Sequence, residues 1–338
     1  MSEIGKLAGV SQPTVSVVIN GKGKEKGIAE ATRKRILDIA REYGFRPNAL
    51  ARSMKTGQTG IIGVLVDKEA MIQTVNDYDS GTAIMNLHAS LLIAGCKVML
   101  EAVDDEDCRN LKMPELLTSG LVDGIIACAC GDDIRYLEKM RAYTDRILLF
   151  DNIQDVDASF VAIDDEETGM RAADYLWDKG FRSFGMISGS EHRLALDARM
   201  EGFAKRIGEL SADTVPVVSA FAGNRWEPEC GGDAVRKLLA ETHRCPDAIF
   251  CSNDFFAYGA EIELLKQGYS VPDDVALIAV GESQLGKSAP VPITSFVPPS
   301  GKITEGVLDI CKMWSKGKKD LVKTCIEPVL FERRSTLK

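Results

Sequence analysis

One stretch near the start of the chain, LAGVSQPTVSVVING (residues 7–21), places five side chains on the outer face of an expected short helix. Ser11 is a good N-cap, and Pro13 falls in the first turn, where its missing N–H costs nothing. The apolar residues at i, i+3 and i+4, which predict the buried stripe, are Val15, Val18 and Ile19. The exposed positions are then Gln12, Pro13, Ser16, Val17 and Asn20. Such a face, presented by a helix in the major groove of DNA, could read base edges.

The chemistry of this face favours A·T pairs. Gln12 can pair bidentately with adenine, and the apolar surface of Val17 suits the thymine methyl group. No Arg or Lys lies between Ala8 and Gly21 to contact guanine. The alternative for Val17 is packing inside the head, although the other three apolar residues of the helix already fill the buried stripe.

Other arrangements that could do chemistry are poor matches to catalytic motifs. The three histidines, His88, His192 and His243, have neither H-E-x-x-H nor triad spacing. GESQLG (281–286) is not a nucleophile elbow, and GKGKEKG (21–27) lacks the closing Gly-Lys-Ser/Thr of a P-loop. The nine Cys have no repeated C-x-x-C spacing, so we expect reduced, mostly buried thiols, with a redox role for Cys128 and Cys130 as the alternative. The sequence thus predicts no enzyme, no metal and no cofactor.

The charge is distributed unevenly along the 338 residues. Residues 1–60 contain 11 basic and 5 acidic residues, a balance of +6, within a chain of net charge −9. The remainder therefore carries −15, which suggests that only the head meets a polyanion. No apolar run approaches the ~18 residues of a membrane span, and MSEIGKLAGV lacks the features of a signal peptide. We expect a cytoplasmic protein with no membrane partner.

The elements that must position these residues begin with three helices, at about 2–7, 11–20 and 29–43. Two short helices joined by a tight turn and followed by a third predict a helix-turn-helix domain. Residues 47–57 predict a short basic helix that is too short to be stable alone. We interpret it as a hinge segment that becomes helical when a partner holds it.

From residue 61 the pattern changes to apolar runs of the kind found in strands that are buried on both faces. Expected strands lie at 61–67, 97–103, 123–129, 146–151, 183–189, 247–253, 274–281 and 293–297. Helices are expected near 82–95, 110–119, 133–142, 166–179, 197–209, 230–242 and 256–267. This βαβ repetition predicts two doubly wound α/β lobes, with a ligand cleft beyond the carboxyl ends of the strands.

Taken together, these segments resemble the lactose-repressor (LacI/GalR) family of bacterial transcription regulators over almost the full length. The head matches the pattern AGVS-x-x-TVS-x-V-x-NG, followed by ATRKRILDIA, YGFRPN and ARSMKTGQT. Matching segments of the body are SNDFFAYGA (252–260), GYSVPDDVAL (268–277), PITSFVPP (292–299) and FERRST (331–336). The resemblance implies an all-α helix-turn-helix head on an α/β body whose two lobes are of the periplasmic-binding-protein type.

The resemblance also implies DNA-binding roles. Gln12, Pro13 and Val17 fall on base-reading positions, where the family usually has Arg in place of Val17, and Thr14 and Asn20 fall on phosphate-contacting ones. Asn48, Arg52 and Met54 belong to the hinge helix, and Met54 takes the place of a Leu wedged into the minor groove. Its alternative is packing against the body. The loop 21–27 has three residues more than the family, which either reach further phosphates or form a floppy insertion.

In the body, the resemblance places effector contacts at the mouth of the cleft. These are Asp151, Arg199 and Asn253, together with Trp226, which either stacks on a sugar or base face or is ordinary packing. The family's usual Asp after the strand at 274–281 is missing, since Gly281 stands there and Glu282 could substitute.

The sequence therefore predicts an effector-responsive regulator, expected to be a repressor, that binds a palindromic operator as a homodimer and senses a sugar or related small molecule. The alternative is a small-molecule-binding protein without DNA-binding function. The expected domains are a helix-turn-helix domain (1–46), a hinge helix and linker (47–59) and a two-lobed body (60–338). The N-lobe is expected at about 60–162 plus 293–320, and the C-lobe at about 163–292 plus 321–338.

Overall fold

The computed structural model describes residues 1–45, 53, 57–68, 71, 80–128, 133–150, 156–189, 194–211, 217–222, 227–242 and 244–337, with only the backbone at 80–83. The chain divides into two compact units, Met1–Thr59 and Gly60–Lys338, which are described separately below. Among the described residues, no helix is long and apolar enough to cross a membrane.

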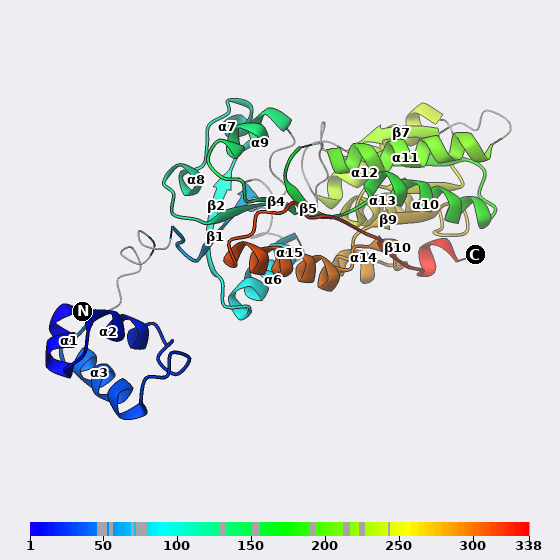
Figure 1. The fold of residues 1–338 in the computed structure, drawn as a ribbon. Coiled ribbons are helices and arrows are strands. Elements are labelled where there is room, and N and C mark those ends of the chain that lie inside the picture. Colours follow the sequence, from blue (N-terminus) through cyan, green and yellow to red (C-terminus); the bar gives the residue numbers. More distant parts are fainter. Residues whose placement is uncertain are drawn as a thin grey trace. The chain divides into compact units, whose positions relative to one another are not determined.

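The head (residues 1–45) consists of three helices, α1 (Ser2–Ala8), α2 (Gln12–Ile19) and α3 (Glu30–Glu42), as Figure 1 shows. The Oγ of Ser11 accepts a hydrogen bond from the N–H of Thr14 and so caps α2. The three helices share one small core, formed by Ile4, Ala8, Val15, Val18, Ile36 and Ala40. The predicted helix-turn-helix head is therefore confirmed. Most of the predicted hinge helix lies outside the described residues.

The N-lobe is built on a six-stranded sheet in which every described pair of strands is parallel. Its order is β11-β5-β4-β3-β1-β2. The strands are β1 (Ile61–Asp67), β2 (Lys97–Val103), β3 (Gly124–Cys128), β4 (Ile147–Phe150), β5 (Ser159–Ile163) and β11 (Lys323–Ile326). The helices of this lobe are α6 (Ser80–Ile93), α7 (Asp105–Arg109), α8 (Glu115–Thr118), α9 (Ile134–Arg141) and α15 (Ser300–Ser315).

The C-lobe repeats this plan with the order β12-β10-β9-β8-β6-β7, and β12 is antiparallel to β10. Its strands are β6 (Phe184–Ser188), β7 (Val217–Phe221), β8 (Ala248–Cys251), β9 (Ala276–Val280), β10 (Thr294–Val297) and β12 (Val329–Phe331). Its helices are α10 (Asp165–Asp178), α11 (Leu194–Leu210), α12 (Pro228–Thr242), α13 (Asp254–Lys266) and α14 (Gln284–Lys287), followed by the 3₁₀ helix η1 (Arg334–Thr336). The two predicted doubly wound lobes are confirmed.

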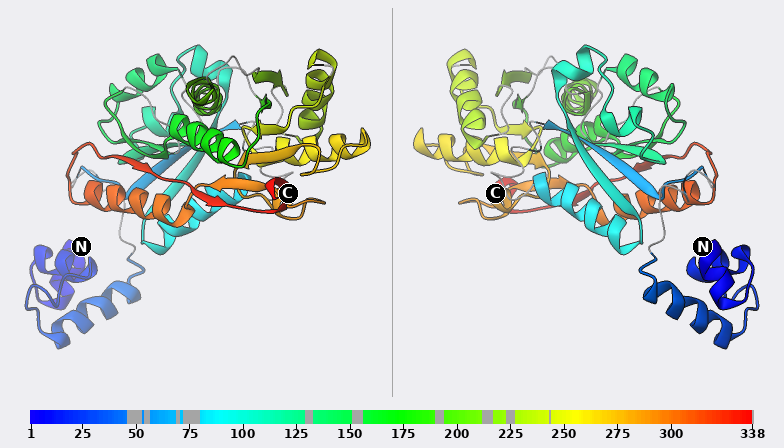
Figure 2. Two further views of the ribbon diagram at one scale, coloured as in Figure 1. Left: turned by 90° about the vertical axis from the view of Figure 1, so that its right-hand side faces the viewer. Right: turned by 90° about the vertical axis from the view of Figure 1, so that its left-hand side faces the viewer.

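Two strands near the C-terminus lie in the other lobe from the one predicted. Residues 293–320 were expected in the N-lobe, where α15 does lie, but β10 pairs with β9 in the C-lobe sheet. Residues 321–338 were expected in the C-lobe, where β12 does lie, but β11 pairs with β5 in the N-lobe sheet. The chain therefore crosses between the lobes after β5, after β10 and between β11 and β12, the last as one continuous ribbon in Figure 2. A strand's lobe is set by the strand it pairs with, which its own residues do not specify.

Four strands and the helices α14 and α15 were not predicted from the sequence, and one expected helix is divided in two. The four strands are β5, β7, β11 and β12, which are three to five residues long, and β11 alternates between exposed and half-buried positions. The helix expected at 110–119 is instead two short helices, α7 and α8. Leu111 interrupts it with a φ of 54°, and Pro114 is the N-cap of α8.

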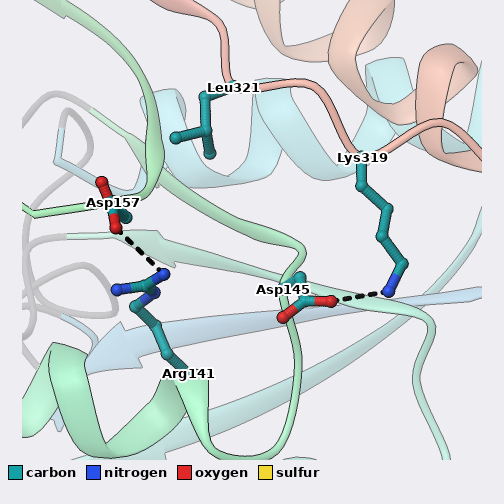
Figure 3. A pocket seen from close by; sticks show the side chains of 5 residues that line it. All are labelled: Arg141, Asp145, Asp157, Lys319 and Leu321. Carbon is teal, nitrogen blue, oxygen red and sulfur yellow. Dashed lines mark hydrogen bonds and ion pairs between the residues drawn. The ribbon is translucent and has the colours of Figure 1, made fainter.

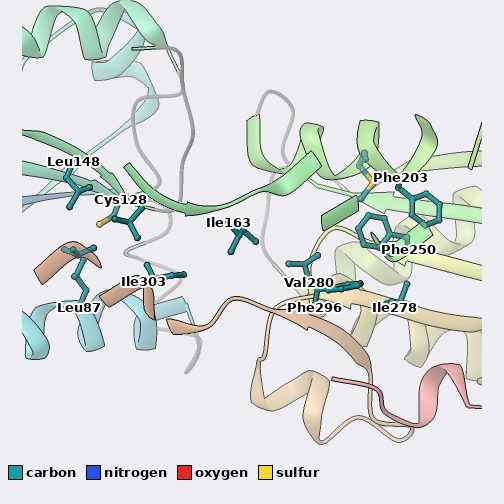
Figure 4. Packing of buried hydrophobic residues seen from close by; sticks show 14 of the residues in the cluster. Leu87, Cys128, Leu148, Ile163, Phe203, Phe250, Ile278, Val280, Phe296 and Ile303 are labelled. Carbon is teal, nitrogen blue, oxygen red and sulfur yellow. The ribbon is translucent and has the colours of Figure 1, made fainter. Parts of the chain in front are cut away.

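The hydrophobic core covers both faces of each sheet. One cluster extends from the N-lobe to the C-lobe and includes Leu87, Ile163, Ile303, Phe250 and Phe296 (Figure 4). Separate clusters cover the opposite face of each sheet. This two-sided burial explains why the strands read as continuous apolar runs. No described cysteine forms a disulfide, and Cys130 lies outside the described residues.

A buried carboxyl group on α13 makes the free energy of unfolding depend on pH. Glu261 is fully buried, and its Oε1 accepts a hydrogen bond from the N–H of Val291 at 2.5 Å, while its Oε2 has no partner among the described residues. Burial raises the pKa of Glu261 from its ordinary 4.5 to about 7. The folded chain therefore keeps a proton that the unfolded chain releases between these two pH values.

We expect the free energy of unfolding to fall as the pH rises from 4.5 to 7, by up to about 3 kcal/mol from this group. Below pH 4.5 the group favours the folded state fully, and this contribution is lost as the pH rises through 7. Glu261→Gln should remove that part of the slope in urea denaturation at pH 5 and pH 7.5. The exposed Glu241→Gln is the control, and equal slopes in the two variants would contradict the assignment.

Candidate functional site

The outer face of α2 is available for contact with a partner. Gln12, Pro13 and Asn20 are exposed, and Thr14, Ser16 and Val17 are half-buried. The side-chain amide of Asn20 donates to the carbonyl oxygen of Ser16 at 2.7 Å, which orients it at the end of the helix. Val17 is not a member of the head's core, whereas Val15 and Val18 are 0% and 4% exposed. Its side chain thus lies outside the stripe that holds the head together.

The predicted hinge residues Asn48, Arg52 and Met54 lie outside the described residues. So do Asp151 and Trp226 in the body. Their proposed roles remain predictions.

In the C-lobe, Arg199 on α11 lies buried at the carboxyl end of β8. Its Nε donates to Oδ1 of Asp165 at 2.6 Å, and its Nη1 donates to the carbonyl oxygen of Ser252 at 2.9 Å. Asp165, in the first turn of α10, is also buried. A guanidinium has five N–H donors, and two are used by these described partners, so others remain for a ligand.

Ser252, which Arg199 contacts, and the following residue Asn253 each have a buried side-chain atom with no partner among the described residues. Asn253 is the N-cap of α13, and its Oδ1 accepts a hydrogen bond from the N–H of Phe256 at 2.8 Å. Its Nδ2 and the Oγ of Ser252 are buried and make no hydrogen bond within the described part of the chain. An unmade hydrogen bond of this kind costs about 1–3 kcal/mol, so these two adjacent groups are candidates for contact with a molecule outside the described residues.

Gly281 stands after β9, at the position where the resemblance predicts a carboxylate. Its φ is 117°, and a Cβ there would lie 2.8 Å from Oδ1 of Asp254. Asp254 is buried and accepts a hydrogen bond from the N–H of Ser283. This position therefore excludes a side chain as long as Asp254 keeps its place.

Glu282, the predicted substitute, forms ion pairs with Arg333 at 3.2 Å and Lys287 at 3.5 Å. Its carboxylate is thus engaged within the C-lobe. Sequence reasoning also missed Asp165 and Ser252. The signal for Asp165 was the Asp-Asp pair directly after the apolar run SFVAI, which is β5.

A hollow of about 320 Å³ lies in the N-lobe, at the end of the sheet where β4 and β5 begin (Figure 3). It is lined by Arg141, Asp145, Asp157, Lys319 and Leu321. Arg141 pairs with Asp157 at 3.1 Å and Lys319 pairs with Asp145 at 2.6 Å, which lowers the pKa of Asp145. Each charge is matched by its neighbour, so the hollow offers a ligand no uncompensated charge.

Two segments of the chain, one in the head and one in the body, each match the model of a known protein family. Residues 1–48 match the model of bacterial regulatory proteins of the lacI family, and residues 173–336 match the periplasmic binding protein-like domain. The HTH-type transcriptional repressor PurR of Mannheimia succiniciproducens is 27% identical and is aligned over 100% of this chain and 98% of its own length. The ribose operon repressor of Escherichia coli is 28% identical, with 100% and 96% covered.

Solved structures show the same fold. The lac repressor dimer bound to operator and the anti-inducer ONPF has a TM-score of 0.81 at 19% identity, covering 99% of this chain and 98% of that one. The transcriptional regulator CelR in complex with cellobiose has a TM-score of 0.70 at 22% identity and the same coverage.

A helix-turn-helix head joined to a two-lobed α/β body defines a ligand-responsive DNA-binding regulator rather than an enzyme. The chain combines the DNA-binding domain of the lacI family of bacterial regulatory proteins, in residues 1–48, with a periplasmic binding protein-like domain, in residues 173–336, and its relatives include transcriptional repressors.

Proposed function

We propose that this regulator is a repressor that reads a palindromic operator with α2 and senses a sugar, or a related polyhydroxy compound, at the carboxyl ends of the strands of its two lobes. The observation that carries the ligand class is the group of buried hydrogen-bonding atoms around Arg199, Ser252 and Asn253. It offers several donors in a dry site, which suits hydroxyl oxygens. The names of the ribose operon repressor and of the CelR–cellobiose complex support the same class.

Three further residues complete the proposed ligand site. We expect Asp151 to bind sugar hydroxyls and Trp226 to stack on the sugar face. Glu282 would contribute only if a ligand draws it from Arg333 and Lys287.

We also propose that the regulator acts as a homodimer in the cytoplasm, where chromosomal operators are. Two half-sites related by a two-fold axis require a two-fold protein. Exposed apolar side chains on α6 and the edge strand β2 support this, since Met85 is 56% exposed and Ile93 is 87% exposed, and Leu92, Met99 and Leu100 are also exposed. The neighbouring lac repressor structure is itself a dimer. Sedimentation of the chain as a monomer at micromolar concentration would contradict the proposal.

A thermal-shift screen of sugars on the full chain tests the ligand class. A compound present at 100 times its Kd should stabilise the chain by about 2.7 kcal/mol. Sugars, amino acids, nucleobases and nucleosides are screened side by side. Stabilisation by a sugar supports the proposal, whereas stabilisation only by a compound without several hydroxyl groups would overturn the ligand class.

Selection from random oligonucleotides tests the DNA-binding function and the predicted base preference of α2. We expect half-sites rich in A·T pairs, because the face offers Gln12 and Val17 but no Arg or Lys. Val17→Arg should introduce a preference for guanine worth about 1–3 kcal/mol at one position.

The control for this selection is Leu37→Arg, which adds the same charge at an exposed position of α3. It should leave the selected sequence unchanged. A guanine-dominated half-site that Val17→Arg does not alter would show that α2 is misassigned. Failure of the chain to enrich any sequence would favour the alternative, a small-molecule-binding protein without DNA-binding function.

A further inference from the structure

The loop that follows α2, residues 21–27, carries Lys22, Lys24 and Lys26, and the base-reading role of α2 does not account for it. We propose that this loop, here called the lysine loop, is a separate phosphate-binding element of the head. It would add sequence-independent contacts to the DNA backbone beside each half-site. The inference rests on the proposed DNA-binding function and extends it to a surface outside the recognition helix.

The lysine loop has a defined backbone rather than the form of a floppy insertion. Gly21, at a φ of 77°, lets its N–H donate to the carbonyl oxygen of Val18 while the N–H of Lys22 donates to that of Val17. This pair of bonds is a Schellman motif that closes the end of α2. The loop then folds back on itself, because the N–H of Lys26 donates to Lys22 and that of Gly27 to Lys24.

The loop is also packed against the head. Gly23 is buried, and a Cβ at this position would lie 2.8 Å from Cδ of Arg33 and 3.2 Å from Cγ2 of Val18. The N–H of Ile28 donates to the carbonyl oxygen of Gly23 at 2.9 Å, and Ile28 packs on the head's core. The loop backbone is thus held by the same residues that position α2. Lysines on a held backbone lose less entropy when they bind than lysines on a free one.

The three lysines are available to a polyanion. Each is exposed, and the ion pairs within residues 1–45 are Arg33 with Glu30 and Arg41 with Asp38, neither of which involves the loop. Glu25 is the single acidic residue in the loop, so the loop carries a net charge of +2.

The position of the loop suits a phosphate backbone. α2 has eight residues and is therefore about 12 Å long. In a helix-turn-helix head the N-terminal residues of the recognition helix contact the base edges, so the C-terminal end of α2 lies away from those bases, toward the phosphate backbone. Asn20 ends the exposed stripe of α2, and Lys22 follows two residues later. The lysine loop thus begins at the end of α2 that is directed toward the phosphate backbone.

The test compares two variants that remove the same charge. Lys24→Gln/Lys26→Gln alters the loop, and Lys34→Gln/Arg41→Gln alters exposed cations of α3. Binding is measured by fluorescence anisotropy at increasing KCl, on a random-sequence duplex and on a duplex obtained from the selection described above. Each lost phosphate contact should lower the slope of log K against log salt by about 1, so the loop variant should lose about 2 per head.

The loop variant should lose affinity for both duplexes by the same factor, because phosphate contacts carry no sequence information. Lys24→Arg/Lys26→Arg should keep the wild-type slope, which separates lost charge from a disturbed fold. Equal slopes in the loop variant and in the α3 variant would overturn the inference while leaving the DNA-binding function intact. A wild-type chain whose DNA affinity does not depend on salt would overturn both.

Discussion

Arg199→Ala is expected to lower the free energy of unfolding by about 3–5 kcal/mol and to abolish detectable binding of the sugar found in the screen. The substitution leaves the buried carboxylate of Asp165 without its cation, and removal of one partner from a buried ion pair has this cost. It also frees the carbonyl oxygen of Ser252, which accepts from Arg199 at 2.9 Å. Urea denaturation followed by circular dichroism measures the stability, and calorimetry measures the affinity.

Arg206→Ala provides the matched control on the same helix. Arg206 is 31% exposed and pairs with Asp174 at 2.8 Å and Glu209 at 2.9 Å, and exposed pairs contribute only about 0–1 kcal/mol. It should leave the sugar affinity unchanged. A loss of less than about 1 kcal/mol in Arg199→Ala would mean that the buried pair is not the structural link between α10 and α11. Unchanged calorimetric affinity in that variant would show that Arg199 does not bind the ligand.

Gly169→Val should destabilise the chain by about 3 kcal/mol and weaken ligand binding at the same time. α10 and α11 cross at two glycines, where a Cβ on Gly169 would lie 2.0 Å from the carbonyl oxygen of Arg199 and a Cβ on Gly202 would lie 2.1 Å from that of Glu166. Neither contact can be relieved by a rotamer change, because both neighbours are backbone atoms. Asp165 lies one turn before Gly169, so helices that are pushed apart also separate Asp165 from Arg199.

The control is Gly208→Val on α11, where an added Cβ meets nothing within 4 Å. Because Val has a higher helix propensity than Gly, this change should be neutral or slightly stabilising. The melting temperature by differential scanning calorimetry and the sugar affinity are measured for both variants. If Gly169→Val kept wild-type stability, the close approach of the two helices would be wrong. If it lost stability but kept the affinity, the helix crossing would not position the ligand site.

Local patterns in the sequence were sufficient for the head. The cap at Ser11, the i, i+3, i+4 stripe of Val15, Val18 and Ile19, and the Asn-Gly end of α2 each depend on residues within one or two turns. In the body, apolar runs such as IIGVLVD predicted β1 with its observed bounds, because strands that are covered on both faces need apolar side chains at every position.

Some strands were not predicted from the sequence. The edge strand β11, for example, is buried on only part of its surface, so its residues show only a weak hydrophobic pattern. Its membership in the N-lobe sheet depends on pairing with β5, which lies some 160 residues earlier in the chain. No property of the residues KTCI specifies that partner.

By itself, the sequence indicated the class of protein, the exposed face of α2 that is proposed to read DNA, and Arg199 and Asn253 as candidate ligand-binding residues. The tertiary structure alone decided that Asp165 pairs with Arg199, that Ser252 and Asn253 keep unpaired polar atoms, and that Asp254 fills the space where Gly281 lacks a side chain. The physical reason is the range of the interactions. Caps, turns and buried stripes are local, whereas ion pairs, desolvation and steric exclusion depend on which distant backbone segments the fold brings within a few ångströms of one another.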